Sequence, residues 1–356
     1  MSYCLNPNCS HPHNPSPSQF CHACGSPLRL KERYRALRPI GQGGFGRTFL
    51  AVDEDKPSKP YCVIKQLLPQ VQKQQSLEKA AQMFEREAVQ LDILGRHEQI
   101  PDLMAYFFQG DRQYLVQEFI EGDDLAQELA ANGSFSETQI RALLKDLLPV
   151  LEFVHQHQVV HRDIKPANII LRRSDERLFL VDFGAAKGVD ADGSMQTGTA
   201  IGSMGYIPPE QALGRATYAS DLYSLGVTCI HLLTGIAPSN LFDSYEGVWT
   251  WHGQLPNPVS EPLARVLDKM LHPIPSQRYQ SARDVLSDVQ KPYQLPDGTS
   301  NLDFEIERIR SQFVQPKPPK SSPPSPPPTI TTANAIDLEL EELRAEFFKN
   351  NGQKPS

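Results

Sequence analysis

A short segment flanked by two apolar runs carries three side chains that could act together on a phosphoryl group. Asp163, Lys165 and Asn168 fall within six positions, between the apolar residues 159–160 and 169–171. Transfer of a phosphoryl group needs a carboxylate to orient the accepting hydroxyl, a cation near the transferred phosphate and an oxygen ligand for Mg²⁺. The segment supplies one residue of each kind.

A second carboxylate follows on a glycine-containing turn. Asp182 comes after the apolar run 178–181, which has the character of a buried strand, and Gly184 ends the turn. A carboxylate delivered at the end of such a strand is suited to bridging a metal ion and phosphate groups. The sequence therefore offers two acidic side chains and one amide for the same chemistry.

A run of glycines lies near the start of the main body of the chain. Gly41, Gly43 and Gly46 have the spacing Gly-x-Gly-x-x-Gly, and glycine lets a backbone fold closely over phosphate oxygens. The same spacing marks dinucleotide-binding loops, but those loops open a helix. Residues 47–52 instead continue with the β-branched and aromatic character of a strand. We therefore expect a strand-turn-strand flap.

A lysine and a glutamate form the next candidate pair. Lys65 ends an apolar strand, where its ammonium could neutralise phosphates, although such a lysine is often only a solvated edge residue. Glu87 falls in the apolar stripe of a helix, between Phe84 and Leu91. A carboxylate on that stripe points inward and needs a cationic partner. We expect Lys65 to be this partner.

In their order along the chain, these motifs resemble those of the eukaryotic-type protein kinase family. The resemblance runs from the glycine run to about Arg278. It implies an α+β, bilobal protein kinase fold with a small β-rich N-lobe and a larger helical C-lobe. It makes Asp163 the catalytic carboxylate and Lys165 a contact of the γ-phosphate of ATP. It also makes Asn168 and Asp182 the ligands of Mg²⁺ or Mn²⁺.

The same resemblance identifies residues around the nucleotide. The backbone of Glu118 and Ile120 is expected to meet adenine, with Gln117 before them in the gatekeeper position. Val63 is expected to touch the adenine ring and Asp124 to lie near the ribose. The full expected set of nucleotide contacts is Gly41, Gly43, Gly46, Thr48, Val63, Lys65, Glu87, Glu118, Ile120, Asp124, Asn168 and Asp182.

Other motif residues imply scaffold roles. Glu210 is expected to pair with Arg278 in a buried bridge, and Asp221 to brace the catalytic loop. Thr48 and Pro208 depart from the valine and alanine that the family commonly has, but neither change removes a charge needed for transfer. An inactive module that holds ATP and recruits partners is therefore the disfavoured alternative.

The catalytic segment also indicates the class of acceptor. Lys165 and the segment 202–206 resemble the serine/threonine branch of the family, and Ser203 is expected to support the catalytic loop by hydrogen bonding. The implied function is a bacterial serine/threonine protein kinase that phosphorylates protein substrates in signalling.

Hydroxyl side chains between Asp182 and Glu210 are candidates for regulatory phosphorylation. Ser194, Thr197 and Thr199 lie there, and Arg162 offers a cation for a phosphate on one of them. The alternative is that all three are solvated loop hydroxyls.

The first 28 residues form a candidate metal module. Cys4, Cys9, Cys21 and Cys24 have the pattern Cys-x4-Cys and Cys-x2-Cys, which predicts a structural Zn²⁺ site. The alternatives are redox-active or idle thiols. The module resembles a short zinc-ribbon segment found ahead of certain cyanobacterial kinases. Nucleic-acid binding through it is disfavoured, because basic and aromatic residues are not interleaved there.

The kinase-like body is expected over residues 34–293, followed by a tail at 294–356. Two similar amphipathic segments, 302–313 and 336–347, flank a proline-rich linker at 315–329. The segments are either short solvated helices or docking sites for a partner.

Composition restricts the remaining possibilities. A formal net charge of −7 provides no basic field for nucleic acid. No apolar run approaches the roughly 20 residues that span a bilayer, and the N-terminus has no signal-peptide core. We expect a protein with no membrane span that works in the cytoplasm.

Overall fold

The computed structural model describes residues 1–15, 18–43, 46–68, 74–183, 187–188 and 203–291. The hydroxyls of Ser194, Thr197 and Thr199 lie outside the described residues. So do the amphipathic segments 302–313 and 336–347 and the linker 315–329. The predictions about these segments are therefore not tested by the structure.

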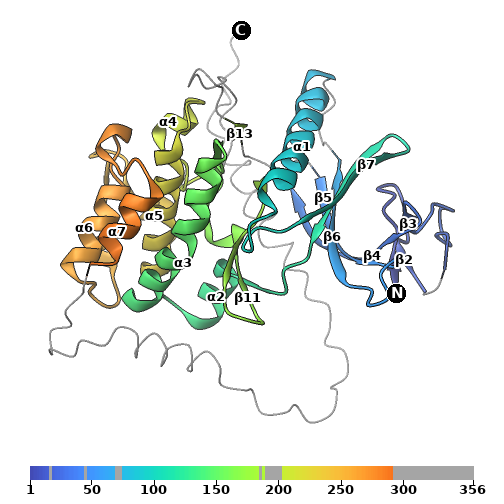
Figure 1. Cartoon of the computed structure of the whole chain (residues 1–356), viewed down its shortest axis with the longest axis horizontal. Coiled ribbons are helices and arrows are strands. Elements are labelled where there is room, and N and C mark those ends of the chain that lie inside the picture. The colour runs from blue at the N-terminus through green and yellow to red at the C-terminus, as the bar shows by residue number, and fades with distance from the viewer. Residues whose placement is uncertain (16–17, 44–45, 69–73, 184–186, 189–202, 292–356) are drawn as a thin grey trace, which may run out of the picture. The chain divides into compact units, whose positions relative to one another are not determined.

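An antiparallel sheet of six strands forms the N-lobe, in the order β3-β4-β5-β6-β8-β7 (Figure 1). Its strands are β3 (Arg29–Leu30), β4 (Tyr34–Gly43), β5 (Gly46–Asp53), β6 (Tyr61–Leu67), β7 (Leu103–Gln109) and β8 (Arg112–Glu118). Helix α1 (Gln74–Leu94) contacts β6 and β7. The glycine run lies where β4 turns into β5, with Gly43 opposite Gly46, so the predicted strand-turn-strand flap is present.

Side chains alternate between the two faces of this sheet. Phe49 and Ile64 lie opposite each other on β5 and β6 and are fully buried on one face. Thr48 comes one position before Phe49 on β5, and Lys65 comes one position after Ile64 on β6. Both side chains therefore point to the other face of the sheet. The sheet thus separates an apolar face from a face that carries the lysine.

The N-terminal cysteine module packs on the apolar face. Strand β1 (Ser2–Tyr3) pairs with β2 (His13–Asn14) inside the module and contacts β4 of the sheet (Figure 1). Tyr3 and Leu5 join the same buried cluster as Phe49 and Ile64. The module is therefore docked on the N-lobe through side chains that the sequence had not marked for that role.

Helices build the C-lobe around α5 (Tyr218–Thr234), nearly all of which is buried. It contacts α3 (Glu137–Gln156) and α6 (Glu261–Met270), and both of these contact α7 (Ala282–Val289). The close approach of α5 to α6 depends on Gly226, where a Cβ would lie 3.0 Å from the Cβ of Met270. The remaining helices are α2 (Leu125–Asn132), α4 (Pro209–Ala212) and the 3₁₀ turns η1 (Pro166–Asn168), η3 (Pro238–Asn240), η4 (Trp251–Gln254) and η5 (Pro275–Gln277).

Short strands carry the loops that matter for chemistry. The sheet β12-β11-β9 contains β9 (Gly122–Asp124), β11 (Ile169–Arg172) and β12 (Leu178–Leu180). Two further pairs are β10 (Val159–Val160) with β13 (Lys187–Gly188), and β14 (Phe242–Asp243) with β15 (Val248–Trp249). Residues 161–168 therefore run from β10 into β11, and Asp182 follows β12 closely.

The α+β fold class, with a β-rich N-lobe and a helical C-lobe, is confirmed. Among the helices that the structure describes, none combines the length and the hydropathy required to cross a bilayer.

Candidate active site

The carboxylate of Asp163 lies at the centre of a dense set of hydrogen bonds. The Lys165 ammonium donates to its Oδ2 at 2.9 Å, and the Asn168 side-chain amide donates to the same oxygen at 2.9 Å. The backbone N–H of Ser203 donates to Oδ1 at 2.9 Å, while the Ser203 hydroxyl accepts from Lys165. The three residues singled out in the sequence therefore meet, and the expected support from Ser203 is present.

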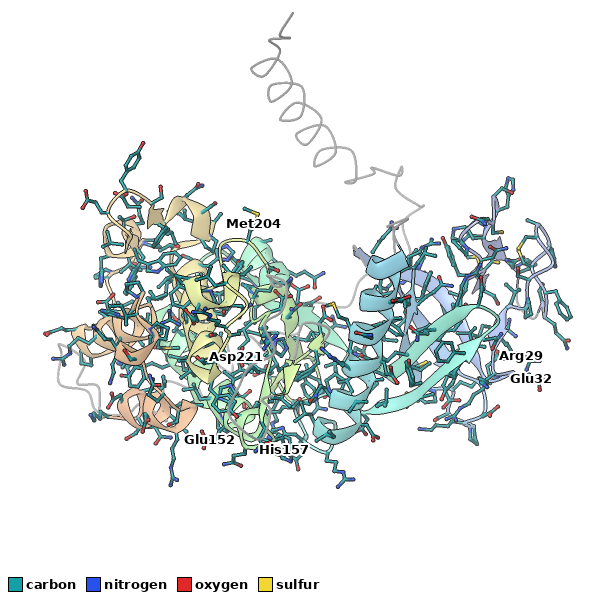
Figure 2. All side chains as sticks on the ribbon, turned by 90° about the horizontal axis from the view of Figure 1, so that it is seen from above. Arg29, Glu32, Glu152, His157, Met204 and Asp221 are labelled. Atoms are coloured by element: carbon teal, nitrogen blue, oxygen red, sulfur yellow. The ribbon has the colours of Figure 1, made fainter. Side chains whose placement is uncertain are left out.

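Asp221, a buried aspartate on α5 (labelled in Figure 2), holds the loop that carries Asp163. The carboxylate of Asp221 is fully buried and accepts from the backbone N–H groups of His161 and Arg162, at 2.9 and 2.8 Å. Burial opposes its ionisation, but the hydrogen bond with His155 and the nearby imidazoles lower the pKa of Asp221 below its ordinary value. Arg162 has φ +70°, a conformation that persists only when its surroundings impose it.

A cluster of one cation and two carboxylates joins the N-lobe to the segment that carries Asp182. The ammonium of Lys65 forms ion pairs with Glu87 on α1 and with Asp182, the latter at 3.0 Å. Burial alone would lower the pKa of Lys65, yet Asp182 and Glu87 raise it above its ordinary value. The charge of Lys65 in turn lowers the pKa of Asp182 to about 2. Lys65 and Asp182 are therefore both charged at neutral pH. Burial raises the pKa of Glu87 above its ordinary value, and the charge of Lys65 opposes this shift.

The glycine run lies beside this cluster. Packing restricts its individual glycines to different degrees. A Cβ on Gly46 would lie 2.2 Å from the backbone oxygen of Gln66, so no side chain fits there. Among the described residues, a Cβ on Gly41 would meet the Thr48 side chain at 3.6 Å, which is an ordinary contact. Strand packing therefore requires glycine at position 46 whether or not a phosphate is bound.

The residues expected around adenine lie on β6, β8 and the segment that leaves β8. Val63 is opposite Gln117 across β6 and β8, and both are buried. Ile120 is buried, and the Glu118 backbone N–H already donates to the Asp102 carbonyl at 2.9 Å.

Asp124, expected near the ribose, serves as a helix cap. Its Oδ1 accepts from the backbone N–H groups of Ala126 and Gln127, each at 2.9 Å, at the start of α2. This role leaves Oδ2 available to a ligand hydroxyl. Asp124 and Gln127 form a capping box, a pattern visible in the sequence, but the cap was not among the predictions.

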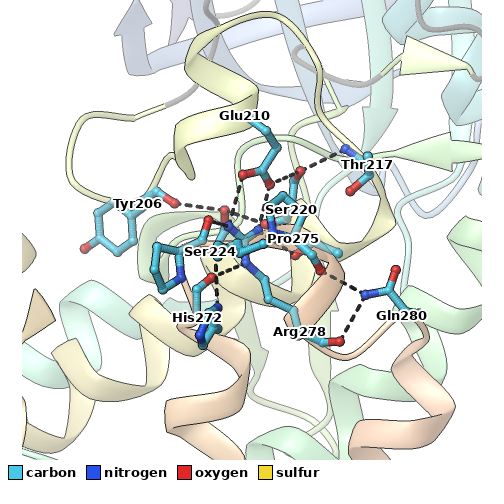
Figure 3. Close-up of polar contacts among 12 residues, drawn as sticks. Tyr206, Glu210, Thr217, Ser220, Ser224, His272, Pro275, Arg278 and Gln280 are labelled. Atoms are coloured by element: carbon cyan, nitrogen blue, oxygen red, sulfur yellow. Dashed lines mark hydrogen bonds and ion pairs between the residues drawn. The ribbon is translucent and has the colours of Figure 1, made fainter. Parts of the chain in front are cut away.

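The expected bridge between Glu210 and Arg278 is present in a buried network (Figure 3). The Arg278 guanidinium donates to both Glu210 oxygens, at 2.7 and 3.0 Å, and its side chain is 0% exposed. Its other N–H groups donate to the backbone carbonyls of His272 and Pro273. Ser220 on α5 donates to Glu210 Oε1 at 2.7 Å. The network ties residues 208–212 to the helical C-lobe.

The four cysteine sulfurs of the N-terminal module converge. Their Sγ atoms all lie within 4.8 Å of one another, and the pairs Cys4 with Cys24 and Cys9 with Cys21 are 3.6 Å apart. Four thiolates at a Zn–S distance of about 2.3 Å in tetrahedral geometry are separated by roughly 3.8 Å. The donor set and its spacing therefore fit one Zn²⁺ ion.

Two positioning residues were missed by sequence reasoning. His155, in the last turn of α3, donates to Asp221 Oδ2 at 2.9 Å, and Gln211 donates to the Arg162 carbonyl at 2.6 Å. Both contacts join segments about fifty residues apart or more. His155 falls on the apolar stripe of its helix, as Glu87 does on α1, and that stripe was the available signal.

The chain is similar in sequence to known protein kinases. The model of the protein kinase domain matches residues 34–290. The chain is 44% identical over 301 residues to Serine/threonine-protein kinase B of Synechocystis sp., covering 82% of this chain and 52% of that protein. It is 43% identical over 286 residues to Serine/threonine-protein kinase PknA of Nostoc sp., covering 76% of this chain and 50% of that protein. The chain thus spans about half the length of these relatives.

Proposed function

The chain belongs to the protein kinase family, and on this premise we propose that it transfers the γ-phosphoryl group of ATP to serine and threonine hydroxyls of proteins. Two linked pairs of side chains carry the proposal: Asn168 bonds to Asp163, and Lys65 pairs with Asp182. The segments of the two pairs are joined where the Val181 N–H donates to the Asn168 carbonyl at 3.0 Å. Each of the four side chains supplies a group that phosphoryl transfer requires.

Asp163 is proposed as the group that orients the acceptor hydroxyl and receives its proton. Its carboxylate is held by donors on both oxygens, from Ser203 on one side and from Lys165 and Asn168 on the other. Such fixed donors keep the carboxylate aimed without reorganisation during the reaction. Lys165 would then face the transferred phosphate as a second positive charge beside the acceptor.

Asn168 and Asp182 are proposed as the Mg²⁺ ligands. The Asn168 amide nitrogen donates to Asp163, which leaves its Oδ1 as a metal ligand. Asp182 Oδ1 faces Lys65, which leaves Oδ2, and Mg²⁺ prefers oxygen ligands of these two kinds. The bound ion would neutralise charge that develops on the phosphates during transfer.

Zn²⁺ is proposed on Cys4, Cys9, Cys21 and Cys24, where it would supply much of the folding free energy of a module with little apolar core of its own. Metal analysis tests this site. A Cys4→Ser/Cys9→Ser protein should lose about one equivalent of zinc that the parent retains. A Cys229→Ser control, which alters a thiol buried in α5 of the C-lobe, should keep it. Unchanged zinc in the double variant would refute the site.

We propose that phosphorylation of Thr197 or Thr199 regulates the protein, because the guanidinium of Arg162 could bind the phosphate. Burial lowers the pKa of the Arg162 guanidinium, and within the described part of the chain its Nε has no hydrogen-bond partner. A loop phosphate would satisfy that donor and hold the catalytic loop. Unchanged activity of the Thr197→Ala/Thr199→Ala protein would support the alternative of solvated hydroxyls.

The setting of the protein is proposed from its thiols and its family. Six unpaired cysteines suit a reducing compartment, so the cytoplasm is the proposed location and signalling the proposed role. Protein substrates follow from the family, while docking by segments 302–313 and 336–347 remains a prediction.

The direct test of transfer uses γ-labelled ATP with a generic protein acceptor. Asp163→Asn preserves the shape of the side chain and removes its proton acceptor, so transfer should fall by at least about 10²-fold. Asp111→Asn, which alters an aspartate that is 89% exposed, is the matched control and should retain full activity. Equal transfer by the parent and Asp163→Asn would refute the proposal.

A further inference from the structure

The two faces of the N-lobe sheet carry different sites that share the same strands. On β5 and β6, Thr48 and Lys65 lie directly opposite each other, as do Arg47 and Gln66. Because side chains alternate along a strand, Arg47 and Gln66 point away from the face that carries Lys65. They point toward the cysteine module, and each is the immediate chain neighbour of a residue assigned to the nucleotide site.

The module contacts both of these side chains through the residues that flank one of its cysteines. The Arg47 guanidinium donates to the Tyr3 hydroxyl at 3.2 Å. The Gln66 side-chain amide, fully buried, donates to the backbone carbonyl of Leu5 at 2.9 Å. Cys4 lies between Tyr3 and Leu5 in the chain. A single thiol ligand is therefore bracketed by two hydrogen bonds to the strands of the nucleotide site.

Packing reinforces this arrangement. Tyr3 and Leu5 belong to the buried cluster of the sheet, whereas Cys4 packs with Cys21 and Leu28 in the core of the module. The Tyr3 ring lies 5.6 Å from the Phe49 ring, and the Arg47 guanidinium lies 5.3 Å from that same ring. The segment that carries Cys4 is thus fixed on one side by the thiol cluster and on the other by the sheet.

A third contact anchors the same segment further along β4. The Arg35 guanidinium, nearly buried, donates to the Ser2 hydroxyl at 2.9 Å and to the Ser18 carbonyl at 2.8 Å, and it also pairs with Glu54. β4 is the strand that leads into the glycine run. The module is therefore bonded to all three strands, β4, β5 and β6, that shape the phosphate-binding side of the lobe.

We propose that Tyr3 and Leu5 are positioning residues for the nucleotide site, so that metal binding at the four thiols and nucleotide binding at Lys65 favour each other. A metal on Cys4 fixes Tyr3 and Leu5, which fix Arg47 and Gln66 and hence the register of Gly46 and Lys65. Without the metal, Cys4 and its neighbours Tyr3 and Leu5 lose the anchor that the thiol cluster provides. Energetic coupling of this kind must be reciprocal, because each ligand changes the affinity of the other by the same factor.

The test measures binding on the full chain. The dissociation constant of the non-hydrolysable analogue Mg·AMP-PNP is measured with the zinc-loaded protein and again after a chelator has removed zinc. We expect the analogue to bind at least about 5-fold more weakly without zinc. Saturating analogue should strengthen zinc retention against a chromogenic chelator by the same factor.

A pair of substitutions separates positioning from general folding. Tyr3→Phe/Gln66→Met removes both polar links to the module while keeping the side-chain volumes and all four thiols, and it also removes the hydrogen bond from Gln66 to the Tyr114 hydroxyl. The coupling factor, which is the dissociation constant of the analogue without zinc divided by that with zinc, should fall toward 1. KM for Mg·ATP of the zinc-loaded variant should rise with kcat nearly unchanged. If the double variant folds poorly, Tyr3→Phe alone should lower the factor in part. Tyr114→Phe removes only the bond from Gln66 to the Tyr114 hydroxyl and should keep the parent's factor. Arg29→Ala, which alters a β3 residue (Figure 2) that pairs with Glu54 at 3.8 Å and makes neither of the two polar links to the module, should also keep it.

Three results would overturn the inference. They are an unchanged analogue affinity after verified zinc removal, a full coupling factor in the double variant, and a parent protein that carries no metal on these thiols. The inference rests on the proposed nucleotide and zinc sites but not on phosphoryl transfer. A chain that shows the coupling and transfers no phosphate would contradict the proposed function alone.

Discussion

Replacing Glu210 with glutamine should destabilise the C-lobe strongly, because it leaves a buried cation without its counter-ion. The Arg278 side chain is 0% exposed and Glu210 is 12% exposed, so water cannot replace the lost charge. The backbone carbonyls of His272 and Pro273 still accept from the guanidinium, but they carry no net charge. Breaking one side of a buried ion pair costs about 3 kcal/mol or more. In a domain of about 250 residues, 3 kcal/mol corresponds to a fall in Tm of about 6 to 12 °C.

Thermal unfolding of Glu210→Gln beside the parent chain measures this cost. Glu261→Gln is the matched control, because the ion pair of Glu261 with Arg265 is exposed on both sides and contributes little. The control should melt with the parent. A second variant, Arg278→Met, should also unfold earlier, since it leaves the Glu210 carboxylate with only the Ser220 hydroxyl. If Glu210→Gln melts within 1 or 2 °C of the parent, roughly the spread of repeated scans, the reasoning about this network is wrong.

Two further outcomes follow from the charge cluster at Lys65. Glu87→Gln keeps the shape but removes one of the two carboxylates that hold the ammonium, so KM for Mg·ATP should rise about 10-fold, and an unchanged KM would contradict the role of the pair. Its fall in Tm should be smaller than that of Glu210→Gln, because Asp182 still pairs with Lys65. The pKa of Asp182, about 2, lies below its ordinary value of about 3.9, so its contribution to stability is complete above about pH 4 and is lost as the pH falls toward 2. Asp182→Asn should therefore flatten the loss of Tm between about pH 4 and pH 2, and an unaltered slope would show that the carboxylate is not held by Lys65.

Local patterns in the sequence were sufficient for side chains whose role is set by their own segment. The helical spacing around Glu87 predicted an inward carboxylate, and the structure pairs it with Lys65. The strand character of residues 47–52 predicted a flap, and β4 and β5 form it. Fold class followed from the order of these segments together with the family resemblance.

Contacts between distant segments had no such local signal. Tyr3 and Leu5 read as ordinary residues of a cysteine module, because nothing near them indicates that they will pack on β5 and β6. The need for glycine at position 46 comes from the backbone of Gln66 on the neighbouring strand, which only the sheet register reveals. The cap formed by Asp124, whose pattern is local, was missed because its carboxylate was assigned to a ligand instead of to its own helix.

A crystal structure of the chain with Mg·AMP-PNP tests the central claim most directly. The account predicts that Asp182 Oδ2 and Asn168 Oδ1 coordinate Mg²⁺ at about 2.0–2.1 Å, with Lys65 on the phosphates. Asp163 should then face the open side of the γ-phosphate. A nucleotide bound elsewhere, or an ion held without Asp182 and Asn168, would contradict the account.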